Sequence, residues 1–461
     1  MAQQFDYPKT ETDLKQILDE MYSLAFNAQQ LGEVVAFKGL MEIIFSETVI
    51  QTAFHNIKAN KGRRTPGCDG NTMRYLLEKH YPETISMVQE ALRNYQPLPV
   101  RRVYIPKPGK DKKRPLGIPA ILDRVIQECI RIVIEPILEA QFFPHSYGFR
   151  PMRSPDMALE RLTDIVHKTG YHWIVEGDIS KYFDTINHTT LLKKLWHMGI
   201  RDQRVLMVIK QMLKAGIMNE LKENPMGTPQ GGIISPLLAN VYLTSFDWWV
   251  SKQWATKKTN KMSVKTKKPF LEHYRLATLK TKSNLKPAYL IRYADDWVLV
   301  TNSRRNAEKW KWAISGFLAN NLNLQLSMEK TVITNVTKKP VHFLGYEYKV
   351  LPGKARQGFI TKTQPDRARL KAKVKEIHKE IHGLRWEMDK SQLIHKINLV
   401  NMKIRGMLEY YKCTTWVNMA VKKYDETLLR AGYLSLRKRG GAGCPQRKLG
   451  ISYQCMLIGM L

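Results

Sequence analysis

Asp295 and Asp296 are adjacent carboxylates that lie between two apolar runs in the stretch YLIRYADDWVLVT, residues 289–301. The runs at 289–291 and 297–300 are rich in β-branched and aromatic residues, which predicts two short buried strands. Neighbouring carboxylates between buried strands are costly unless a cation neutralises them. Because no Lys or Arg lies inside the turn, and oxygen ligands suit Mg²⁺ or Mn²⁺, the stretch predicts a divalent metal site. A hairpin with Asp in its turn explains this stretch equally well when it is taken alone.

A third carboxylate, Asp178, ends the apolar stretch WIVEGD at 173–178. The stretch predicts a strand, and a strand that ends in Asp brings a carboxylate to the edge of a sheet. An Asp that caps the following turn is the alternative, and it would be favoured if Asp178 stood alone. Asp184, a few residues further on, is interpreted as structural.

Two glycine-containing or basic segments are candidates for binding a charged group. The segment MGTPQGGIISPLLANVYL at 226–243 contains Gly227, Gly231 and Gly232, which allow close backbone approach to a bound group. A hinge between domains is the alternative. The segment at 103–118 predicts a hairpin with a strongly basic tip, and such a tip can fold over a triphosphate or remain a solvated surface. Its cations are Lys107, Lys110, Lys112, Lys113 and Arg114.

The charge balance favours a polyanionic partner. The 461 residues include 74 Lys and Arg against 41 Asp and Glu, a formal net charge of +33. Such an excess predicts salt-dependent binding to phosphates. A ribosomal-type scaffold is disfavoured by the aromatic-rich core runs, and a membrane span is disfavoured because no long apolar run occurs. The five Cys are an odd number without paired spacing, which predicts reduced thiols in a cytoplasm, and the N-terminus carries no targeting signal pattern.

Helical patterns flank the segments that carry these candidates. Residues 1–50 show amphipathic spacing, with Thr12 expected to cap the first helix, and 121–138 predicts a strong amphipathic helix. The pattern at 365–430 is helical and basic. In contrast, 251–288 contains ten Lys and one Arg against a single acid and shows no apolar period. We interpret it as an inserted basic loop that stays disordered until a nucleic acid binds.

The order of these pieces closely resembles the reverse transcriptase domain of group II intron-encoded proteins, over roughly residues 50–430. The pieces are the strand ending in Asp178, TPQGG at 228–232, YADD at 293–296, Lys330 and FLGY at 343–346. The loop HSYGFRP and the segment TPQGGIISPLLANVYL are similar to the group II intron branch in particular. Many relatives continue into a DNA-binding segment and an endonuclease domain, which this chain is expected to lack because Cys444 and Cys455 have no paired spacing.

The resemblance implies an α/β fold, a right-hand polymerase whose fingers and palm contain antiparallel sheet and are followed by an α-helical thumb. The implied parts are an N-terminal helical extension at 1–50, fingers at 51–170, a palm at 171–350 with the basic insertion at 251–288, a thumb or maturase (X) domain at 351–430, and an unassigned tail at 431–461.

The resemblance also implies roles for individual residues. Asp178, Asp295 and Asp296 would be catalytic and would bind two Mg²⁺ ions, with Mn²⁺ as an alternative. Lys330 would be catalytic as the group that protonates the leaving pyrophosphate. Phe183 would exclude a ribose 2′-OH. The remaining implied contacts are Lys107 and Arg114 on the triphosphate, Gln230 beside the nucleotide sugar, and the primer grip of Phe343, Leu344, Gly345 and Tyr346.

The implied function is an RNA-directed DNA polymerase that copies RNA into cDNA and assists splicing and mobility (retrohoming) of its own intron. Its partners would be group II intron RNA, an RNA template, a DNA primer and dNTPs, without a membrane, in a bacterial cytoplasm rather than an organelle. The oligomeric state stays open, and a homodimer is one option. Alternatives are a splicing maturase without polymerase activity, a free-standing reverse transcriptase, and an RNA-dependent RNA polymerase, which Phe183 disfavours.

Overall fold

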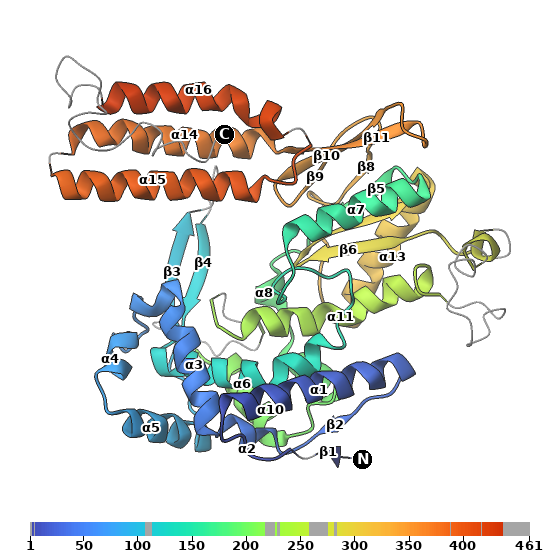
Figure 1. Cartoon of the computed structure of the whole chain (residues 1–461). Helices are drawn as coiled ribbons and strands as arrows, with labels where there is room; N and C mark the ends of the chain where they lie inside the picture. The colour runs from blue at the N-terminus through green and yellow to red at the C-terminus, as the bar shows by residue number, and fades with distance from the viewer. Residues whose placement is uncertain are drawn as a thin grey trace. The chain divides into compact units, whose positions relative to one another are not determined.

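The computed structural model describes residues 2–3, 5–106, 113–216, 226–227, 231–257, 275–280, 284–387, 389–415 and 417–436. Two of the predicted site residues, Lys107 and Gln230, lie outside the described residues, as do Cys444 and Cys455. The chain divides into two compact units (Figure 1). Unit 1 comprises Met1–Ala158, Gly177–Thr301 and Arg305–Val332, and unit 2 comprises Leu159–Glu176, Asn302–Arg304 and Ile333–Leu461. The predicted division into an extension, fingers, palm, thumb and tail stays a prediction.

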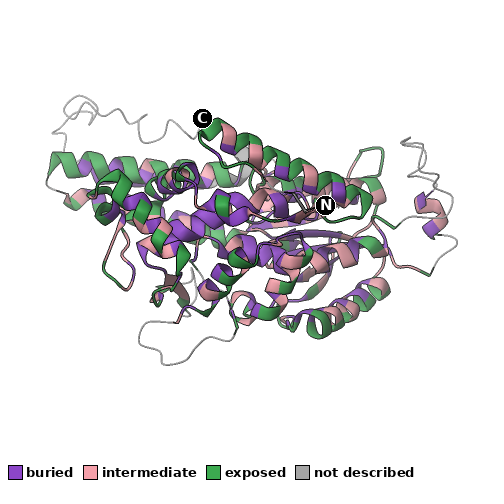
Figure 2. Cartoon of the chain, turned by 90° about the horizontal axis from the view of Figure 1, so that it is seen from below, coloured by how far each residue is buried: buried purple, intermediate pink, exposed green. Residues whose placement is uncertain are grey.

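Unit 1 is built around helix α6, Ile121–Glu139, which packs against α1, α2, α3, α5 and α11. Its apolar residues recur at helical spacing over five turns, and almost every one of them is buried, so α6 is a core helix as its sequence predicted. Figure 2 shows a similar pattern of burial in the rest of the chain, where buried residues lie on the strands and on one side of most helices. The other helices described within this unit are α1 (Glu11–Leu31), α2 (Leu40–Ile44), α3 (Glu47–Ala59), α4 (Met73–Leu77), α5 (Tyr81–Arg93), α8 (Tyr182–Thr185), α9 (His188–His197), α10 (Gln203–Lys214), α11 (Ser235–Gln253) and α13 (Arg304–Leu322), of which Arg304 belongs to unit 2.

The first helix begins two residues earlier than the sequence predicted. The N-cap is Thr10, whose hydroxyl accepts a hydrogen bond from the Asp13 N–H at 3.1 Å, while the Asp13 carboxylate accepts one from the Thr10 N–H at 3.0 Å. The prediction that Thr12 caps α1 is therefore wrong. A reciprocal cap needs an acidic residue or its amide three positions after the cap, and Thr12 has Lys15 there.

Two antiparallel hairpins of unit 1 carry predicted site residues. Strands β3 (Arg101–Pro106) and β4 (Lys113–Ile118) pair with Ile105 opposite Arg114, which confirms the predicted hairpin, although its tip lies outside the described residues. Strands β6 (Tyr289–Tyr293) and β7 (Asp296–Thr301) pair with Tyr293 opposite Asp296. Ala294 and Asp295 are thus the two residues of a tight turn. A short parallel pair joins β1 (Ala2–Gln3) to β2 (Ala36–Phe37).

The basic insertion is described only in part. Residues 275–280 form a helical turn, and Arg275 is buried, donating to the carbonyl oxygens of Trp254 and Lys257 at 3.0 Å each. The prediction of a structureless loop is wrong for these residues. The sequence showed the charge of Arg275 but not the carbonyl groups at the end of α11 to which it donates.

Unit 2 combines short strands with a bundle of three helices. Strands β5 (Trp173–Gly177) and β8 (Val332–Asn335) are neighbours, and β9 (Val341–Phe343), β10 (Tyr346–Pro352) and β11 (Phe359–Pro365) form an antiparallel sheet in the order β11-β10-β9. In Figure 1, α14 (Arg367–Gly383) lies between α15 (Lys390–Tyr410) and α16 (Val417–Leu436). Leu384, Leu393, Ile397 and Leu436 form a buried cluster in the bundle, so the predicted helical region is confirmed. Most of α7 (Pro155–Thr169) also belongs to this unit.

None of the helices in the described ranges combines the length and the apolar character that crossing a bilayer requires.

Candidate active site

A buried ion pair between Arg292 and Asp247 stabilises the turn that carries Asp295. Arg292 is almost completely buried and donates from Nε and Nη2 to the two carboxylate oxygens of Asp247 on α11, at 2.7 and 2.6 Å. Its Nη1 donates to the Ala294 carbonyl at 2.8 Å and to the Asn240 side chain at 3.0 Å. Because Arg292 binds Asp247, Asn240 and the Ala294 carbonyl, it does not neutralise Asp295. Asp247 could not be identified from the sequence as the partner of Arg292.

Ala294 holds a left-handed backbone conformation, with φ of 58°. For a residue with a Cβ this conformation is unfavourable by roughly 1–2 kcal/mol, and it persists only where the surroundings impose it. Here the bond from Arg292 to the Ala294 carbonyl imposes it, and the turn presents the next residue, Asp295, at its apex. Asp295 is half-buried, whereas Asp296, the first residue of β7, is exposed.

Asp178 reaches the same neighbourhood from another part of the chain. Its carbonyl accepts a hydrogen bond from the Ser327 N–H at 2.8 Å, and Ile179 bridges to Leu326. This pairing sets the turn at 328–330 beside Asp178, and the ammonium group of Lys330 forms an ion pair with the Asp178 carboxylate. Two residues that are far apart in the sequence, and that the resemblance implicated separately, therefore contact each other.

The pKa of Asp295 depends on the charges of several of these residues. Burial raises the pKa of Asp295, and the charge of Asp178 raises it further, while Lys330 and Arg114 lower it. Asp178, Lys330 and Arg114 therefore each lie within electrostatic reach of Asp295, from the end of β5, the 328–330 turn and β4. Arg114 is exposed on β4. The remaining repulsion between Asp178 and Asp295 is the kind that a bound cation relieves.

The donor set fits a hard divalent cation, because Asp178 and Asp295 offer carboxylate oxygens, the ligands that Mg²⁺ prefers. The third predicted ligand is not gathered with them. Over the described ranges, a single set of three His, Cys, Asp or Glu residues brings one ligand atom each within 4.8 Å of the others, and it is His342, Glu347 and Asp366. Asp296 therefore does not close a three-carboxylate cluster in this structure, and its role as a ligand stays a prediction.

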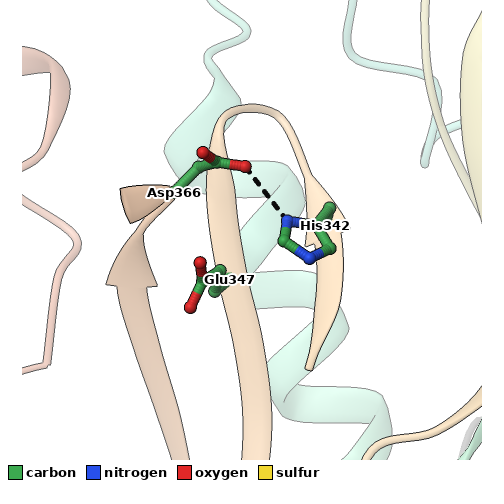
Figure 3. Close-up of side chains that lie close together, drawn as sticks. All are labelled: His342, Glu347 and Asp366. Carbon is green, nitrogen blue, oxygen red and sulfur yellow. Dashed lines mark hydrogen bonds and ion pairs between the residues drawn. The ribbon is translucent and has the colours of Figure 1, made fainter. Parts of the chain in front are cut away.

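The group of His342, Glu347 and Asp366 in unit 2 serves to cap a helix. Asp366 is the N-cap of α14 and accepts a hydrogen bond from the Arg369 N–H at 2.9 Å, while Glu347 accepts one from the Arg367 N–H at 3.3 Å. The Nδ1 atom of His342 lies 3.0 Å from the other carboxylate oxygen of Asp366 (Figure 3). These contacts satisfy N–H groups that every helix leaves unpaired in its first turn, so a structural role accounts for the group.

Phe183 lies on the short helix α8, immediately after the buried residue Tyr182. The Tyr182 hydroxyl donates to the Ala239 carbonyl on α11, which anchors α8. The Phe183 ring is half-exposed and lies 6.3 Å from the ring of Phe149, at an interplanar angle of 73°. Phe149 was missed by sequence reasoning, which treated its loop only as part of a family motif.

The segment that contains Gln230 approaches strand β4 closely. Gly231 has φ of 123°, and a Cβ there would lie 2.5 Å from the carbonyl oxygen of Gly117. Glycine is therefore required at this position, but for contact with protein backbone rather than with a bound group. Gly231 thus lies near the strand of Arg114, whereas the N–H of Gly227 donates to the Ile186 carbonyl at 2.8 Å, beside α8. Gln230 and Lys107 themselves lie outside the described residues.

The predicted primer grip forms the turn between β9 and β10. Leu344 and Gly345 have φ of 51° and 77°, and the Tyr410 hydroxyl donates to the Leu344 carbonyl at 2.7 Å. The side chains of Phe343 and Tyr346 are buried, and the Tyr346 hydroxyl donates to the Tyr410 carbonyl. The hydrogen bonds of Tyr346 and Tyr410 hold the turn against α15. Because the side chains of Phe343 and Tyr346 are buried in this unit, any contact of the turn with a primer would fall to Leu344 and the backbone.

Comparisons with known proteins give similar sequences over about two thirds of this chain. A family profile described as reverse transcriptase (RNA-dependent DNA polymerase) matches residues 105–348. The group II intron-encoded protein LtrA of Lactococcus lactis subsp. cremoris is 34% identical over 347 residues, covering 68% of this chain and 57% of that protein. Protein YkfC of Escherichia coli (strain K12) is 35% identical over 317 residues, covering 67% of this chain and 82% of that protein.

A further similar protein is a putative COX1/OXI3 intron 1 protein of Saccharomyces cerevisiae, 32% identical over 354 residues, covering 70% of this chain and 41% of that protein. The chain thus spans little more than half the length of LtrA and less than half of the yeast protein.

Proposed function

Since the chain belongs to the reverse transcriptase (RNA-dependent DNA polymerase) family, as the order of its motifs predicted, we propose that it copies RNA into DNA. The observation that carries this proposal is the convergence of Asp178, Asp295, Lys330 and Arg114, from four separate segments, on one electrostatic neighbourhood. Phosphoryl transfer needs mainly positioning and charge neutralisation, and carboxylates beside cations supply both.

Asp178 and Asp295, with Asp296 as the predicted third ligand, would hold Mg²⁺, or Mn²⁺ in its place. When bound, two such ions supply activation of the primer 3′-OH and stabilisation of the charge on the leaving pyrophosphate. Lys330 balances the charge of Asp178 through its ion pair. With 61% of its side chain exposed, Lys330 is free to turn and donate an Nζ proton to an oxygen of the pyrophosphate.

The remaining predicted residues would bind and select the nucleotide. Arg114, with Lys107 from the hairpin tip, would provide counter-charges for the triphosphate. The half-exposed ring of Phe183 would occupy the space that a ribose 2′-OH needs, and Gln230 would lie beside the sugar. In this proposal 51–170 are fingers, 171–350 are palm, and 351–430 are thumb, with 343–346 as primer grip.

We further propose that the RNA partner includes a group II intron, whose splicing and mobility the protein assists. Two of the similar proteins bear names that refer to introns, and the net charge of +33 suits a large polyanion. A maturase without polymerase activity is the second candidate. The retained pair of partly buried carboxylates, which raises the energy of the free protein, disfavours it.

A templated extension assay tests the proposal. The protein would be incubated with an RNA template, an annealed DNA primer, Mg²⁺ and dNTPs, and the product sequenced, with template-free and dNTP-free reactions as controls. We expect a product complementary to the RNA. Failure to extend any primer, while RNA binding measured in the same buffer stays tight, would contradict polymerase activity and support the maturase.

A further inference from the structure

The loop HSYGFRPMR at 145–153 is held by a buried arginine at its centre. Arg150 is almost fully buried, and its Nε donates to the Glu139 carboxylate at 2.9 Å. Its Nη1 donates to the carbonyl oxygens of Phe143 and Ser146, at 2.8 and 2.9 Å. A buried guanidinium that binds a carboxylate and two backbone carbonyls at the start of a loop holds that part of the loop in one path, so its conformation is determined by the fold.

The same loop is joined to the hairpin that carries Asp295. The Tyr147 N–H donates to the Arg292 carbonyl at 2.8 Å, and the Arg292 N–H donates to the His145 carbonyl at 3.0 Å. Asn240 donates to the Gly148 carbonyl at 2.9 Å. A Cβ on Gly148 would lie 2.3 Å from the backbone nitrogen of Ala294, so the two backbones are in direct contact. The loop and the Asp295 turn therefore form one rigid assembly.

Phe149, the next residue, is forced into an unusual position by this assembly. Its φ is 61°, a left-handed conformation that is uncommon for a residue with a bulky side chain. Half of its surface is exposed, yet its ring lies edge-on to Phe183 at 6.3 Å. Edge-to-face pairs at such separations are attractive and orient both rings. Core packing does not require a strained backbone at Phe149. Nor does it require contact between the exposed Phe149 ring and Phe183, the predicted nucleotide-selecting residue.

We propose that Phe149 is a positioning residue for nucleotide selection, which holds the Phe183 ring at the angle that excludes a ribose 2′-OH. The inference rests on the proposed polymerase function. The rigid connection through Gly148 and Ala294 sets Phe149 relative to Asp295, and the ring pair sets Phe183 relative to Phe149. Phe183 lies on α8, where the Tyr182 hydroxyl donates to the Ala239 carbonyl of α11 and the Tyr182 ring lies 5.4 Å from the Phe183 ring at an interplanar angle of 60°. Without the Phe149 ring, Phe183 would reach other rotamers and admit a 2′-OH more often.

The test compares dNTP and rNTP incorporation on an RNA template by the full chain. For each variant, kcat/KM is measured for a dNTP and for the rNTP with the same base, and their ratio is the readout. We expect Phe149→Ala to lower the ratio by about 2- to 10-fold, the value of one aromatic pair, through faster rNTP use. Phe149→Tyr keeps the ring and should keep the ratio.

Met152→Ala is the matched control, because Met152 lies on the same loop, has φ of 55° and is 92% exposed. It should leave the ratio unchanged. The double variant Phe149→Ala with Phe183→Ala should discriminate no worse than Phe183→Ala alone, since the first residue acts through the second. An additive loss in the double variant, or an unchanged ratio in Phe149→Ala, would overturn the inference while leaving the polymerase proposal intact. A wild-type protein that extends no primer would instead remove the polymerase proposal itself.

Discussion

At the scale of single residues, the site contains a partly buried carboxylate, Asp295, close to a second carboxylate, Asp178, which is unfavourable for stability. Asp295 carries a raised pKa because it is partly buried and close to Asp178, and its neighbour Arg292 is already committed to Asp247. The lysine that balances Asp178 is mostly exposed. Residues held at an energetic disadvantage of this kind are characteristic of functional sites. The triad of Asp178, Asp295 and Asp296 stays a prediction, and Asp296 differs from the other two because it is exposed.

A buried carboxyl outside the site leads to a prediction about pH. Burial raises the pKa of Asp123 to about 6, although the Tyr95 hydroxyl and the Leu98 N–H donate to it at 2.9 and 3.1 Å. Between about pH 4 and 6 the folded chain therefore binds more protons here than the unfolded chain does. The contribution of Asp123 to the free energy of unfolding should fall as pH rises through this window, by about 3 kcal/mol in total, and stay level above it.

Thermal unfolding of wild type and Asp123→Asn from pH 4 to 8 checks this sign. Asn cannot ionise, so the variant should gain stability relative to wild type between pH 4 and 6, whatever it loses in hydrogen bonding. A difference between the two proteins that is flat with pH would contradict the raised pKa.

At the scale of elements, the sequence predicted what depends on local pattern. The apolar spacing of α6, the two hairpins and the helices after residue 365 appear where they were expected. It could not predict features that depend on contacts across long sequence separations. The start of α1 was mispredicted for a local reason, because Thr10, unlike Thr12, pairs with an acid three residues later. The burial of Arg275, in contrast, depends on carbonyls at the end of α11. The position of Phe149 depends on a loop pressed against a hairpin well over a hundred residues away.

The contact between the 145–153 loop and the β6–β7 hairpin predicts the effect of adding one methyl group to Gly148. Gly148→Ala should displace the Ala294 backbone, because its Cβ would lie 2.3 Å from the Ala294 nitrogen. We expect a loss of about 1–3 kcal/mol in the free energy of unfolding, and a fall in polymerase kcat of roughly 10²-fold from the displaced Asp295.

Gly316→Ala is the control for Gly148→Ala. Gly316 lies inside α13 with open space around its Cβ position, so alanine there should stabilise the helix by up to about 1 kcal/mol. Denaturant unfolding and primer extension report both effects. Wild-type activity in Gly148→Ala would contradict a rigid connection between the loop and the turn.

At the scale of the whole molecule, the cations behind the net charge of +33 have different surroundings. Many lysines are paired with acids, but Arg367, Lys371, Lys375 and Lys379 form an exposed row on one side of α14 at four-residue intervals. Like charges at this spacing destabilise an isolated helix, so a row of them favours binding to a polyanion. Successive members are about 6 Å apart along the helix, which suits a series of phosphates.

Neutralising that row should change how RNA binding depends on salt. The triple variant Lys371→Gln, Lys375→Gln and Lys379→Gln should bind RNA more weakly and reduce the slope of log K against log salt by about 2 if all three contact phosphates. A matched triple, Lys168→Gln, Lys373→Gln and Lys412→Gln, removes the same charge from lysines that pair with Asp164, Glu376 and Glu409. Equal slopes for the two triples would mean that the row is solvated surface.

The central claim is that Asp178 and Asp295 form the reacting site of an RNA-directed DNA polymerase. The most direct measurement is the single-turnover rate of adding one dNTP to a primer on an RNA template, for Asp178→Asn, Asp295→Asn and the neighbouring control Asp184→Asn. We expect the first two variants to lose on the order of 10³-fold in rate, because each removes a carboxylate that would hold the Mg²⁺ ions that neutralise the transition state, with Asp184→Asn close to wild type. Rates near wild type for Asp178→Asn and Asp295→Asn would contradict the claim.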